Sequence, residues 1–270
     1  MNELRDEVTR FLHHHGLRLN TDLGQHFLVD ETALALIVEA AGITEEDRIV
    51  EIGPGIGVLT RELARRAGKV SAVELDERML PLLKSFLSGE GKELLTKVTV
   101  TRGNALHTPL PADPYKIVAN IPYHITSPLL RHVFLESQAP PTTMTLLIQK
   151  EVAETICDGR NAGILTILVG LFGTPRYVGT VGREAFLPPP KVDSAILHVE
   201  CFARPLAEPA VVEKIFTLTK TGFGQKRKML RNTLGKLPEG MEKLKGIGID
   251  PERRPQTLTV GEWIRLAEVM

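Results

Sequence analysis

Apolar residues follow two patterns that alternate along most of this chain. Short runs rich in β-branched residues predict strands, whereas longer stretches with an apolar residue every three or four positions predict helices. The expected strands cover residues 48–52, 69–73, 97–101, 115–119 and 143–148, with two later ones near 176–181 and 192–200. The expected helices cover residues 30–41, 58–66, 76–87, 127–134 and 151–156, the first with Asp30 as its N-cap.

Strands that alternate with helices predict an α/β fold, a doubly wound and mostly parallel sheet with helices on both faces. Ligands bind such sheets beyond the carboxyl ends of the strands. Residues 203–209 (ARPLAEP) are typical of a linker, and residues 210–221, 225–234 and 262–270 beyond them have helical spacing. The sequence therefore predicts two domains, a large α/β domain over 1–204 and a small α-helical domain over 205–270.

Length and composition fit a globular protein without a membrane partner. Of the 270 residues, 43% are hydrophobic and 24% are charged, and no apolar stretch approaches the length of a transmembrane helix. Residues 1–16 mix both charge signs and lack the apolar core of a signal peptide, so we expect a cytoplasmic protein. Cys157 and Cys201 are too few for a disulfide framework and are expected to be buried free thiols. Residues 13–15 are histidines, but nothing nearby completes a ligand set, so no metal site is expected.

The net charge of +0 gives no indication of a nucleic-acid partner, but the charges are unevenly distributed. Between Lys214 and Lys236 there are seven basic residues and no acidic one. Such a segment binds a polyanion in some proteins and is only a solvated helix face in others. The charges alone do not decide between the two interpretations.

A glycine-rich loop follows the first strand of the expected sheet. Residues 51–57 (EIGPGIG) end that strand and open a helix, where Gly53 and Gly55 let the backbone approach a ligand and the helix N-terminus presents free N–H groups. Glu74 ends the second strand, where its carboxylate can accept hydrogen bonds from ribose hydroxyls, and Asn104 follows the third, where it can read an adenine edge. These positions favour a cofactor that contains a nucleoside, either a nicotinamide dinucleotide or S-adenosylmethionine.

Residues 120–123 (NIPY) follow the fourth strand at the same edge of the sheet. An aromatic amine is a poor nucleophile because its lone pair is delocalised into the ring. Two acceptors that bind its hydrogens, here the Asn120 side-chain oxygen and the Ile121 carbonyl, favour the tetrahedral geometry that frees this lone pair. Pro122 fixes φ and so keeps both acceptors in place, and Tyr123 offers a flat face on which an extruded base can stack. In isolation, these four residues are better explained as a strand end followed by a proline turn.

A second aromatic residue, Phe186, opens a proline-rich loop over residues 186–191 (FLPPPK). Its ring would cover the other face of the base and form a sandwich with Tyr123. A base inside a duplex cannot reach such a pocket, so the enzyme would extrude it or bind it unstacked. The alternative is that Phe186 is a core aromatic residue that anchors the loop.

Seven motifs occur in an order that resembles the small-subunit ribosomal RNA adenine dimethyltransferases of the KsgA/RsmA type. They are GQHFL (24–28), EIGPGIGVLT (51–60), VELD (73–76), GNAL (103–106), NIPYHIT (120–126), FLPPPKVDSA (186–195) and FGQKRKMLRNTL (223–234). The resemblance, which runs from about residue 21 to the C-terminus, implies a Rossmann-like class I methyltransferase fold with S-adenosylmethionine as the methyl donor. It also implies N6-dimethylation of two adjacent adenines in a hairpin near the 3′ end of 16S rRNA, within the immature small subunit. We expect a monomer that also serves small-subunit biogenesis.

The resemblance assigns residues to three roles by position. The cofactor site would be lined by His26, Leu28, Gly53, Gly55, Glu74, Asn104 and Asn120. The base would be handled by Asn120, Ile121, Pro122, Tyr123 and Phe186, and the RNA by Lys226, Arg227, Lys228 and Arg231. Two positions depart from the usual pattern, since His26 stands where the family commonly has Asn and Asn104 where it commonly has Asp. Without the charge assistance of an Asp at position 104, we expect somewhat weaker cofactor binding.

Three alternatives stay open from the sequence. A related group methylates large-subunit rRNA, confers macrolide resistance and also carries NIPY, but the FLPPPKVDSA and QKRKMLRNTL segments and the ending GIDPERRPQTLTV favour the small-subunit enzyme. A non-catalytic RNA-binding or ribosome-assembly factor on the same fold is the second, against which the intact glycine loop and NIPY argue. A nicotinamide dehydrogenase is the third, and it gives no role to NIPY or to the basic segment.

Overall fold

The computed structural model describes residues 3–17, 19, 24–159, 161–225 and 227–270. The chain divides into two compact units, the first made of Met1–Ala153 with Arg176–Cys201 and the second of Glu154–Pro175 with Phe202–Met270. The second unit therefore takes in residues 154–175 besides the C-terminal chain that follows the expected linker. The assignment of functional domains to 1–204 and 205–270 stays a prediction.

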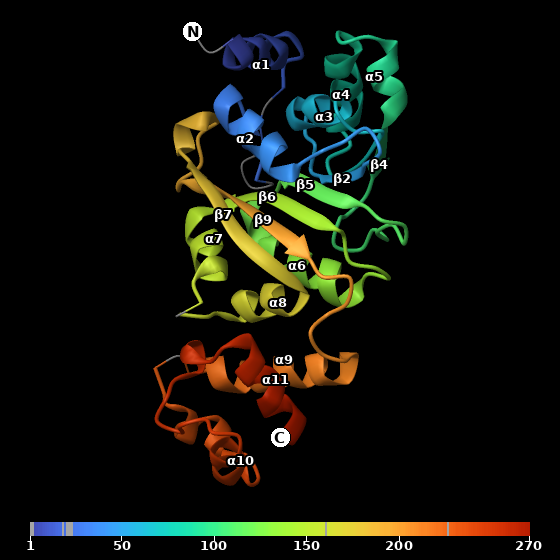
Figure 1. Ribbon diagram of the computed structural model, residues 1–270. Helices are drawn as coiled ribbons and strands as arrows, with labels where there is room; N and C mark the ends of the chain where they lie inside the picture. The colour runs from blue at the N-terminus through green and yellow to red at the C-terminus, as the bar shows by residue number, and fades with distance from the viewer. Residues whose placement is uncertain (1–2, 18, 20–23, 160, 226) are drawn as a thin grey trace. The chain divides into compact units, whose positions relative to one another are not determined.

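A central sheet contains seven strands (Figure 1). They are β2 (Arg48–Ile52), β3 (Lys69–Glu74), β4 (Val98–Arg102), β5 (Lys116–Asn120), β6 (Thr143–Gln149), β7 (Gly173–Val181) and β9 (Ser194–Cys201). Their order is β4-β3-β2-β5-β6-β9-β7, with parallel pairing from β4 through β6 and with β9 antiparallel to β6. The predicted mostly parallel sheet is confirmed. The strand order reverses between β2 and β5, and such a switch point is where α/β sheets bind their ligands.

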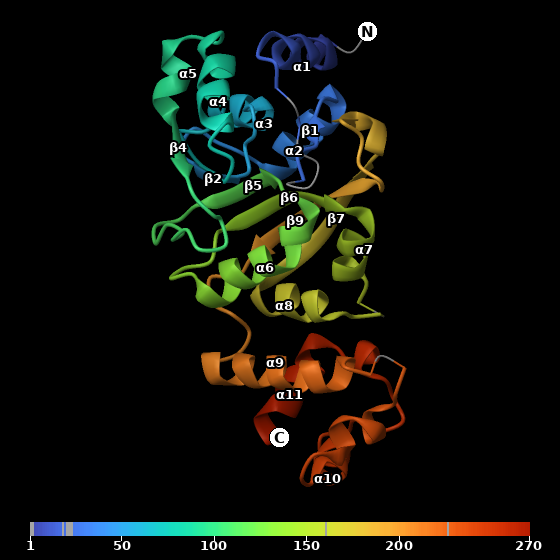
Figure 2. The same cartoon turned by 180° about the vertical axis from the view of Figure 1, so that it is seen from behind.

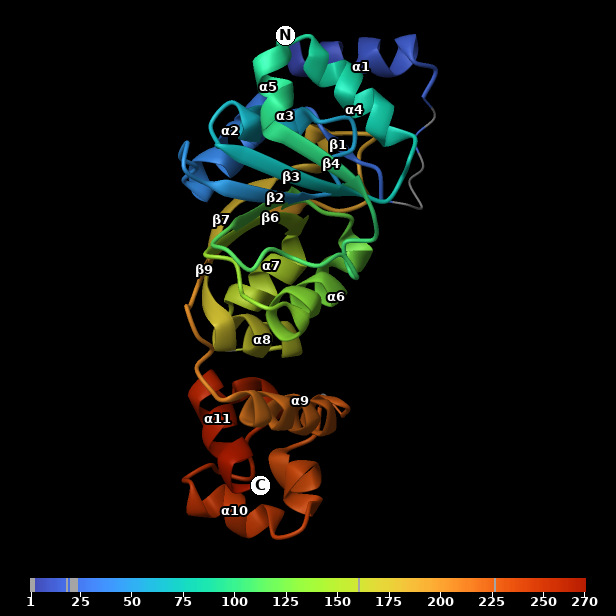
Figure 3. The same ribbon diagram turned by 90° about the vertical axis from the view of Figure 1, so that its right-hand side faces the viewer.

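Helices lie on both sides of this sheet (Figures 1, 2 and 3). One side carries α1 (Glu3–His14), α2 (Glu31–Ala41), α3 (Val58–Ala64), α4 (Met79–Ser88) and α5 (Lys92–Lys97), and the other carries α6 (Thr126–Arg131). α6 continues into a π-helical turn at His132–Glu136, and α7 (Lys150–Cys157) follows β6. α2 begins where the sequence predicts it, with the Asp30 side chain accepting a hydrogen bond from the Ala33 N–H at 2.8 Å. α1 and α5 were not predicted.

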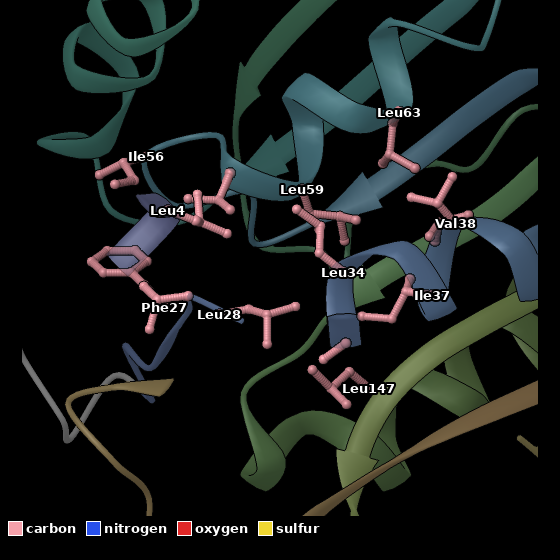
Figure 4. Packing of buried hydrophobic residues seen from close by; sticks show 14 of the residues in the cluster. Leu4, Phe27, Leu28, Leu34, Ile37, Val38, Ile56, Leu59, Leu63 and Leu147 are labelled. Atoms are coloured by element: carbon pink, nitrogen blue, oxygen red, sulfur yellow. The ribbon is translucent and has the colours of Figure 1, made fainter. Parts of the chain in front are cut away.

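Apolar side chains from α2, α3 and the sheet meet in the main core (Figure 4). Leu34 and Ile37 of α2 lie one helical turn apart, so both face the core, as does Leu59 of α3. Leu147 of β6 and Ile56 of the glycine-rich loop are completely buried. Because the loop itself contributes to the core, its backbone is held in place between β2 and α3.

The second unit is mainly helical in the part of the chain that the structure describes, apart from the first residues of β7. Its helices are α8 (Ile164–Phe172), α9 (Pro209–Phe223), α10 (Gly240–Gly246) and α11 (Val260–Val269). α9 and α11 pack closely, because Gly222 leaves room for the Trp263 ring, which stacks on Phe223 with 5.9 Å between the ring centroids. The predicted helices over 210–221 and 262–270 correspond to α9 and α11.

The helix predicted over residues 225–234 is wrong. The described residues there form short 3₁₀ turns, Leu230–Asn232 and then Leu234–Lys236. The backbone N–H of Leu230 donates to the carbonyl of Arg253, and that of Arg231 donates to Pro251. These bonds to a distant segment take the donors that a helix would use within itself. Burial of the Leu230 and Leu234 side chains holds this arrangement, so tertiary contacts override the helical spacing.

Both cysteines are free thiols, as expected, but each is only partly buried. No helix in the part of the chain that the structure describes combines the length and the apolar character that a membrane crossing requires.

Candidate active site

The glycine-rich loop turns sharply at the end of β2. Gly53 and Gly55 have φ values of 66° and 57°, in the left-handed region that favours glycine. A Cβ at Gly55 would also lie 2.5 Å from the ring of Phe27, so a larger residue cannot be accommodated without movement. The loop therefore requires glycine for its own conformation and for the close packing of the N-terminal segment against it.

Glu74 ties the end of β3 to this loop. Its Oε2 accepts a hydrogen bond from the Gly55 N–H at 3.0 Å, and its Oε1 accepts one from the Asp76 N–H at 2.8 Å. Burial of the side chain raises the pKa of Glu74, and the backbone hydrogen bonds oppose that rise. Each oxygen has a second lone pair, so the carboxylate can still accept hydrogen bonds from a ligand.

Asn104 lies in the loop after β4. Its Oδ1 accepts a hydrogen bond from the Leu106 N–H at 3.0 Å, which fixes the orientation of the amide group. The Nδ2 group is then left as a donor, with one lone pair of Oδ1 as an acceptor. This is the combination that matches the edge of an adenine.

One cavity of about 130 Å³ connects these strand ends. All seven residues expected to bind the cofactor line it, namely His26, Leu28, Gly53, Gly55, Glu74, Asn104 and Asn120. The structure thus brings together residues that come from four different strand ends and from the N-terminal segment. Their contact with a cofactor stays a prediction.

Glu51, to which the sequence analysis gave no role, also lines this cavity. Its side chain is 1% exposed, and its Oε2 has no hydrogen-bond partner among the described residues. Burial raises the pKa of Glu51 to about 8; the Thr60 hydroxyl opposes that rise and the negative charge of Glu74 adds to it. The signal was present in the sequence, because a carboxylate inside the apolar strand 48–52 is unusual unless it has a task.

Asn120 ends β5 and faces the same cavity. Its Nδ2 donates a hydrogen bond to the backbone carbonyl of His26 at 3.0 Å. Because a carbonyl only accepts, the contacting atom must be the nitrogen, and this fixes the direction of the amide. Oδ1 is therefore left as an acceptor, as the proposed chemistry of NIPY requires.

Pro122 holds the NIPY turn against both neighbouring loops. A Cβ at Gly24, whose φ is 73°, would lie only 2.6 Å from Cβ of Pro122, and a Cβ at Gly53 would lie 3.7 Å from its Cδ. The proline ring is thus packed between the N-terminal segment and the glycine-rich loop. This packing keeps the acceptors of residues 120 and 121 in place without a ligand.

Tyr123 lies in a second cavity that adjoins the first. This cavity, of about 310 Å³, is lined by Gly24, His26, Asn120, Ile121, Pro122, Tyr123, His124 and Gln149, of which Gly24, His26, Asn120, Pro122 and His124 also line the first. The Tyr123 hydroxyl forms a hydrogen bond of 2.6 Å with Oγ of Ser194. Burial raises the pKa of Tyr123, so the phenol is neutral at physiological pH. The glycine-rich loop and the NIPY turn therefore share one continuous site.

Phe186 is not brought to this site. Its side chain is completely buried in the main core, and it lines neither cavity. It belongs to β8 (Phe186–Leu187), which pairs antiparallel with β1 (Phe27–Leu28) so that Phe186 lies opposite Leu28. This placement matches the alternative of a core residue that anchors the loop, and the predicted sandwich with Tyr123 would require Phe186 to leave the core.

The residues expected to contact RNA lie in the second unit. Arg227 and Lys228 are exposed, and Lys226 lies outside the described residues. Arg231 is also exposed and forms an ion pair of 2.6 Å with Glu252. Exposed pairs of this kind contribute little to stability.

Comparisons with known proteins cover both units of the chain. A family model described as ribosomal RNA adenine dimethylase matches residues 16–270. The ribosomal RNA small subunit methyltransferase A of Dehalococcoides mccartyi is 37% identical, over 97% of this chain and 92% of that protein. The protein of the same name from Novosphingobium aromaticivorans is 39% identical, over 99% of this chain and 97% of its own. The solved structure of the 23S rRNA methyltransferase ErmE is 30% identical with a TM-score of 0.72, and the match covers 90% of this chain and 98% of that one.

Proposed function

The chain belongs to the ribosomal RNA adenine dimethylase family, and from this membership we propose that it dimethylates two adjacent adenines in a hairpin near the 3′ end of 16S rRNA. As a member it is an S-adenosylmethionine-dependent ribosomal RNA adenine dimethyltransferase. The choice of the small subunit is supported by the names of the two bacterial relatives and by the motifs after residue 186. We further propose that the enzyme acts as a cytoplasmic monomer on the immature small subunit and contributes to its biogenesis. Family membership excludes the nicotinamide dehydrogenase.

The first cavity fits S-adenosylmethionine, which supplies an electrophilic methyl group when bound. Gly53 and Gly55 line this cavity, and Glu74 and Asn104 offer acceptors and a donor suited to a nucleoside. Oε2 of Glu51 is a buried acceptor without a partner among the described residues. A cationic ligand beside this buried group would favour its ionised form, and S-adenosylmethionine is a cation.

The observation that carries the proposed chemistry is the orientation of the Asn120 amide, whose Nδ2 donates to the His26 carbonyl and so leaves Oδ1 as an acceptor. This atom and the Ile121 carbonyl would accept the two hydrogens of the adenine amine and so favour its tetrahedral form. Tyr123 would stack on the base, and the interlocked glycines and Pro122 hold these groups before the base arrives. No general base is required, because the amine becomes strongly acidic once it carries the new methyl group.

Mapping methylated nucleosides by mass spectrometry tests the proposal. Purified enzyme is incubated with small subunits from a strain that lacks this modification, and with large-subunit RNA in parallel. We expect two adjacent N6-dimethyladenines near the 3′ end of 16S rRNA, seen also as a block to primer extension. Modification of the large-subunit RNA alone would instead place the enzyme with the macrolide-resistance group.

The Asn104→Asp variant should bind the cofactor more tightly than the wild type. Aspartate keeps the acceptor for the Leu106 N–H and adds charge assistance to a hydrogen bond with the adenine amine. We expect the dissociation constant of S-adenosylhomocysteine, measured by calorimetry, to fall about threefold to tenfold. Asn161→Asp, at an exposed position of the second unit, adds the same charge as a control. Equal constants for Asn104→Asp and the wild type would mean that residue 104 does not contact the adenine edge.

The basic surface of the second unit is tested by reversing two charges. We expect the double variant Arg227→Glu/Lys228→Glu to bind small-subunit RNA more weakly and with a flatter salt dependence. Each lost phosphate contact lowers the slope of log K against log salt by about 0.7 to 0.9. Lys84→Glu, at an exposed position of α4, serves as the matched control. A slope equal to that of the wild type would remove these two residues from the RNA interface.

A further inference from the structure

The loop after β4, which carries Asn104, is closed by several hydrogen bonds to one carbonyl. The backbone N–H groups of His107 and Thr108 and the Thr108 hydroxyl all donate to the carbonyl of Asn104 at 2.9 Å. The Asn104 side chain accepts from the Leu106 N–H at 3.0 Å. The loop is tight at its start as well, since a Cβ at Gly103 would lie 2.9 Å from Oγ1 of Thr108. The position of Thr108 therefore sets the position of Asn104.

A buried histidine, His132, contacts this loop from outside the cofactor cavity. Its Nε2 lies 3.1 Å from the carbonyl of Thr108. Because a carbonyl only accepts, Nε2 carries a proton and donates it to that oxygen. The residue is 9% exposed and lines neither of the two cavities of the site. A buried ring offers its donor at a fixed place, and this donor holds the Thr108 end of the loop.

His132 stands at the end of the helix that follows the NIPY turn. That turn leads through a 3₁₀ segment, Tyr123–Ile125, into α6, and the π-helical turn His132–Glu136 comes next. Single π-helical turns within helices are often found at functional sites. Nδ1 of the same ring lies 3.0 Å from Oε2 of Glu136, whose side chain is 57% exposed, so water can replace this second contact. The contact with Thr108 is therefore the one through which His132 connects α6 to the loop after β4.

We propose that His132 is a positioning residue for the cofactor, which holds Asn104 through the Thr108 carbonyl in the orientation that binds the adenine edge of S-adenosylmethionine. The inference rests on the proposed function in its assignment of Asn104 to the cofactor, and it does not depend on which RNA is methylated. A loop that is ordered in advance loses less conformational entropy when its ligand binds. Loss of the Nε2 donor should therefore weaken cofactor binding and leave the residues that handle the base in place.

Calorimetry with S-adenosylhomocysteine tests this role without any RNA. We expect His132→Leu, which removes both ring nitrogens, to raise the dissociation constant about threefold to tenfold. His132→Asn, whose amide is too short to reach the Thr108 carbonyl, should be impaired to a similar degree. His132→Gln places an N–H donor about as far from the backbone as Nε2 and should recover most of the loss. With S-adenosylmethionine at saturation, kcat of His132→Leu should stay within about twofold of the wild type, because the interaction that is lost concerns binding of the cofactor.

A double-mutant cycle shows whether His132 acts through Asn104. In the Asn104→Ala background, His132→Leu should change the dissociation constant by less than about 1.5-fold, because the contact that it positions is already absent. A merely structural role would weaken binding by the same factor in both backgrounds.

His198 of β9 provides a matched control, because it is 3% exposed and lines neither cavity. Its ring nitrogens lie 2.9 Å from Oγ1 of Thr145 and 3.0 Å from Oε1 of Glu200, so it resembles His132 in burial and in hydrogen bonding. His198→Leu should lower the melting temperature and leave the dissociation constant of S-adenosylhomocysteine unchanged. Glu136→Gln, which alters only the exposed contact of His132, should bind as the wild type does.

Three results would overturn the proposal while Asn104→Ala still weakens binding. They are a wild-type dissociation constant for His132→Leu, an equal impairment of His132→Gln and His132→Leu, and additive effects in the double-mutant cycle. A loss of kcat in His132→Leu with unchanged cofactor binding would also overturn it, since His132 would then position the NIPY turn. Wild-type binding by Asn104→Ala would remove Asn104 from the cofactor site, and the role of His132 with it, whatever RNA the enzyme methylates.

Discussion

Replacing Asn120 with alanine is expected to lower kcat for methyl transfer about 10²- to 10³-fold at saturating S-adenosylmethionine. The side chain supplies a preorganised acceptor at the atom where charge develops, and removing one such group from an enzyme site commonly has an effect of this size. The hydrogen bond from Nδ2 to the His26 carbonyl fixes the position of Oδ1 in advance. Single-turnover transfer of labelled methyl groups to the RNA that the wild type methylates measures the chemical step directly.

Two controls identify the lost function. Asn104→Ala, in the loop after β4 that lines the same cavity, should raise the KM for the cofactor and leave kcat at saturation close to the wild type. Asn120→Asp retains acceptor oxygens but loses the donor to the His26 carbonyl 3.0 Å away, so we expect it to be impaired as well. If Asn120→Ala labels RNA as fast as the wild type, Asn120 has no part in the chemistry. If neither protein labels any RNA, the chain is a non-catalytic binding factor on this fold.

Much of the sheet could be predicted because each strand has a local signature. The β-rich run at 48–52 predicts both ends of β2 correctly, and the run at 143–148 predicts the ends of β6 to within one residue. α8 could not be predicted in this way, since Ile164–Phe172 is apolar nearly throughout and such a run has no periodicity to interpret. The 3₁₀ turns after α9 could not be predicted from the sequence, because their hydrogen bonds run to residues 251 and 253.

The site residues also divide into those that local sequence signals place and those that contacts with distant segments place. Residues that stand at strand ends, such as Glu74 and Asn120, could be placed together because parallel strands end at one edge. Phe186 could not be placed, because its burial depends on the pairing of residues 186–187 with residues 27–28. The nearly parallel orientation of the His26 and Tyr123 rings could not be predicted for the same reason. Their hydrogen-bond partners, Pro188 and Ser194, lie far from them in the sequence.

The second large effect concerns the stability of Glu51→Gln. Burial and the nearby charge of Glu74 raise the pKa of Glu51 from 4.5 to about 8. The folded protein then holds this proton between about pH 4.5 and pH 8, whereas the unfolded chain has lost it. Because the unfolded state binds fewer protons across that interval, the free energy of unfolding falls as the pH rises through it. Glutamine does not titrate, so this contribution is absent from the variant.

Between pH 5 and pH 8, we therefore expect the wild type to lose about 2 to 4 kcal/mol of unfolding free energy that the Glu51→Gln variant keeps. Urea titration of both proteins at each pH measures this difference. Glu74 titrates in both proteins, so the difference between the two curves isolates residue 51. The same carboxylate should ionise more readily beside a cationic ligand, so S-adenosylmethionine should bind the wild type more tightly as the pH approaches 8 and bind the variant with little pH dependence. Parallel stability curves would show that the Glu51 carboxyl titrates normally in the fold, so that burial does not keep it protonated in the cofactor cavity.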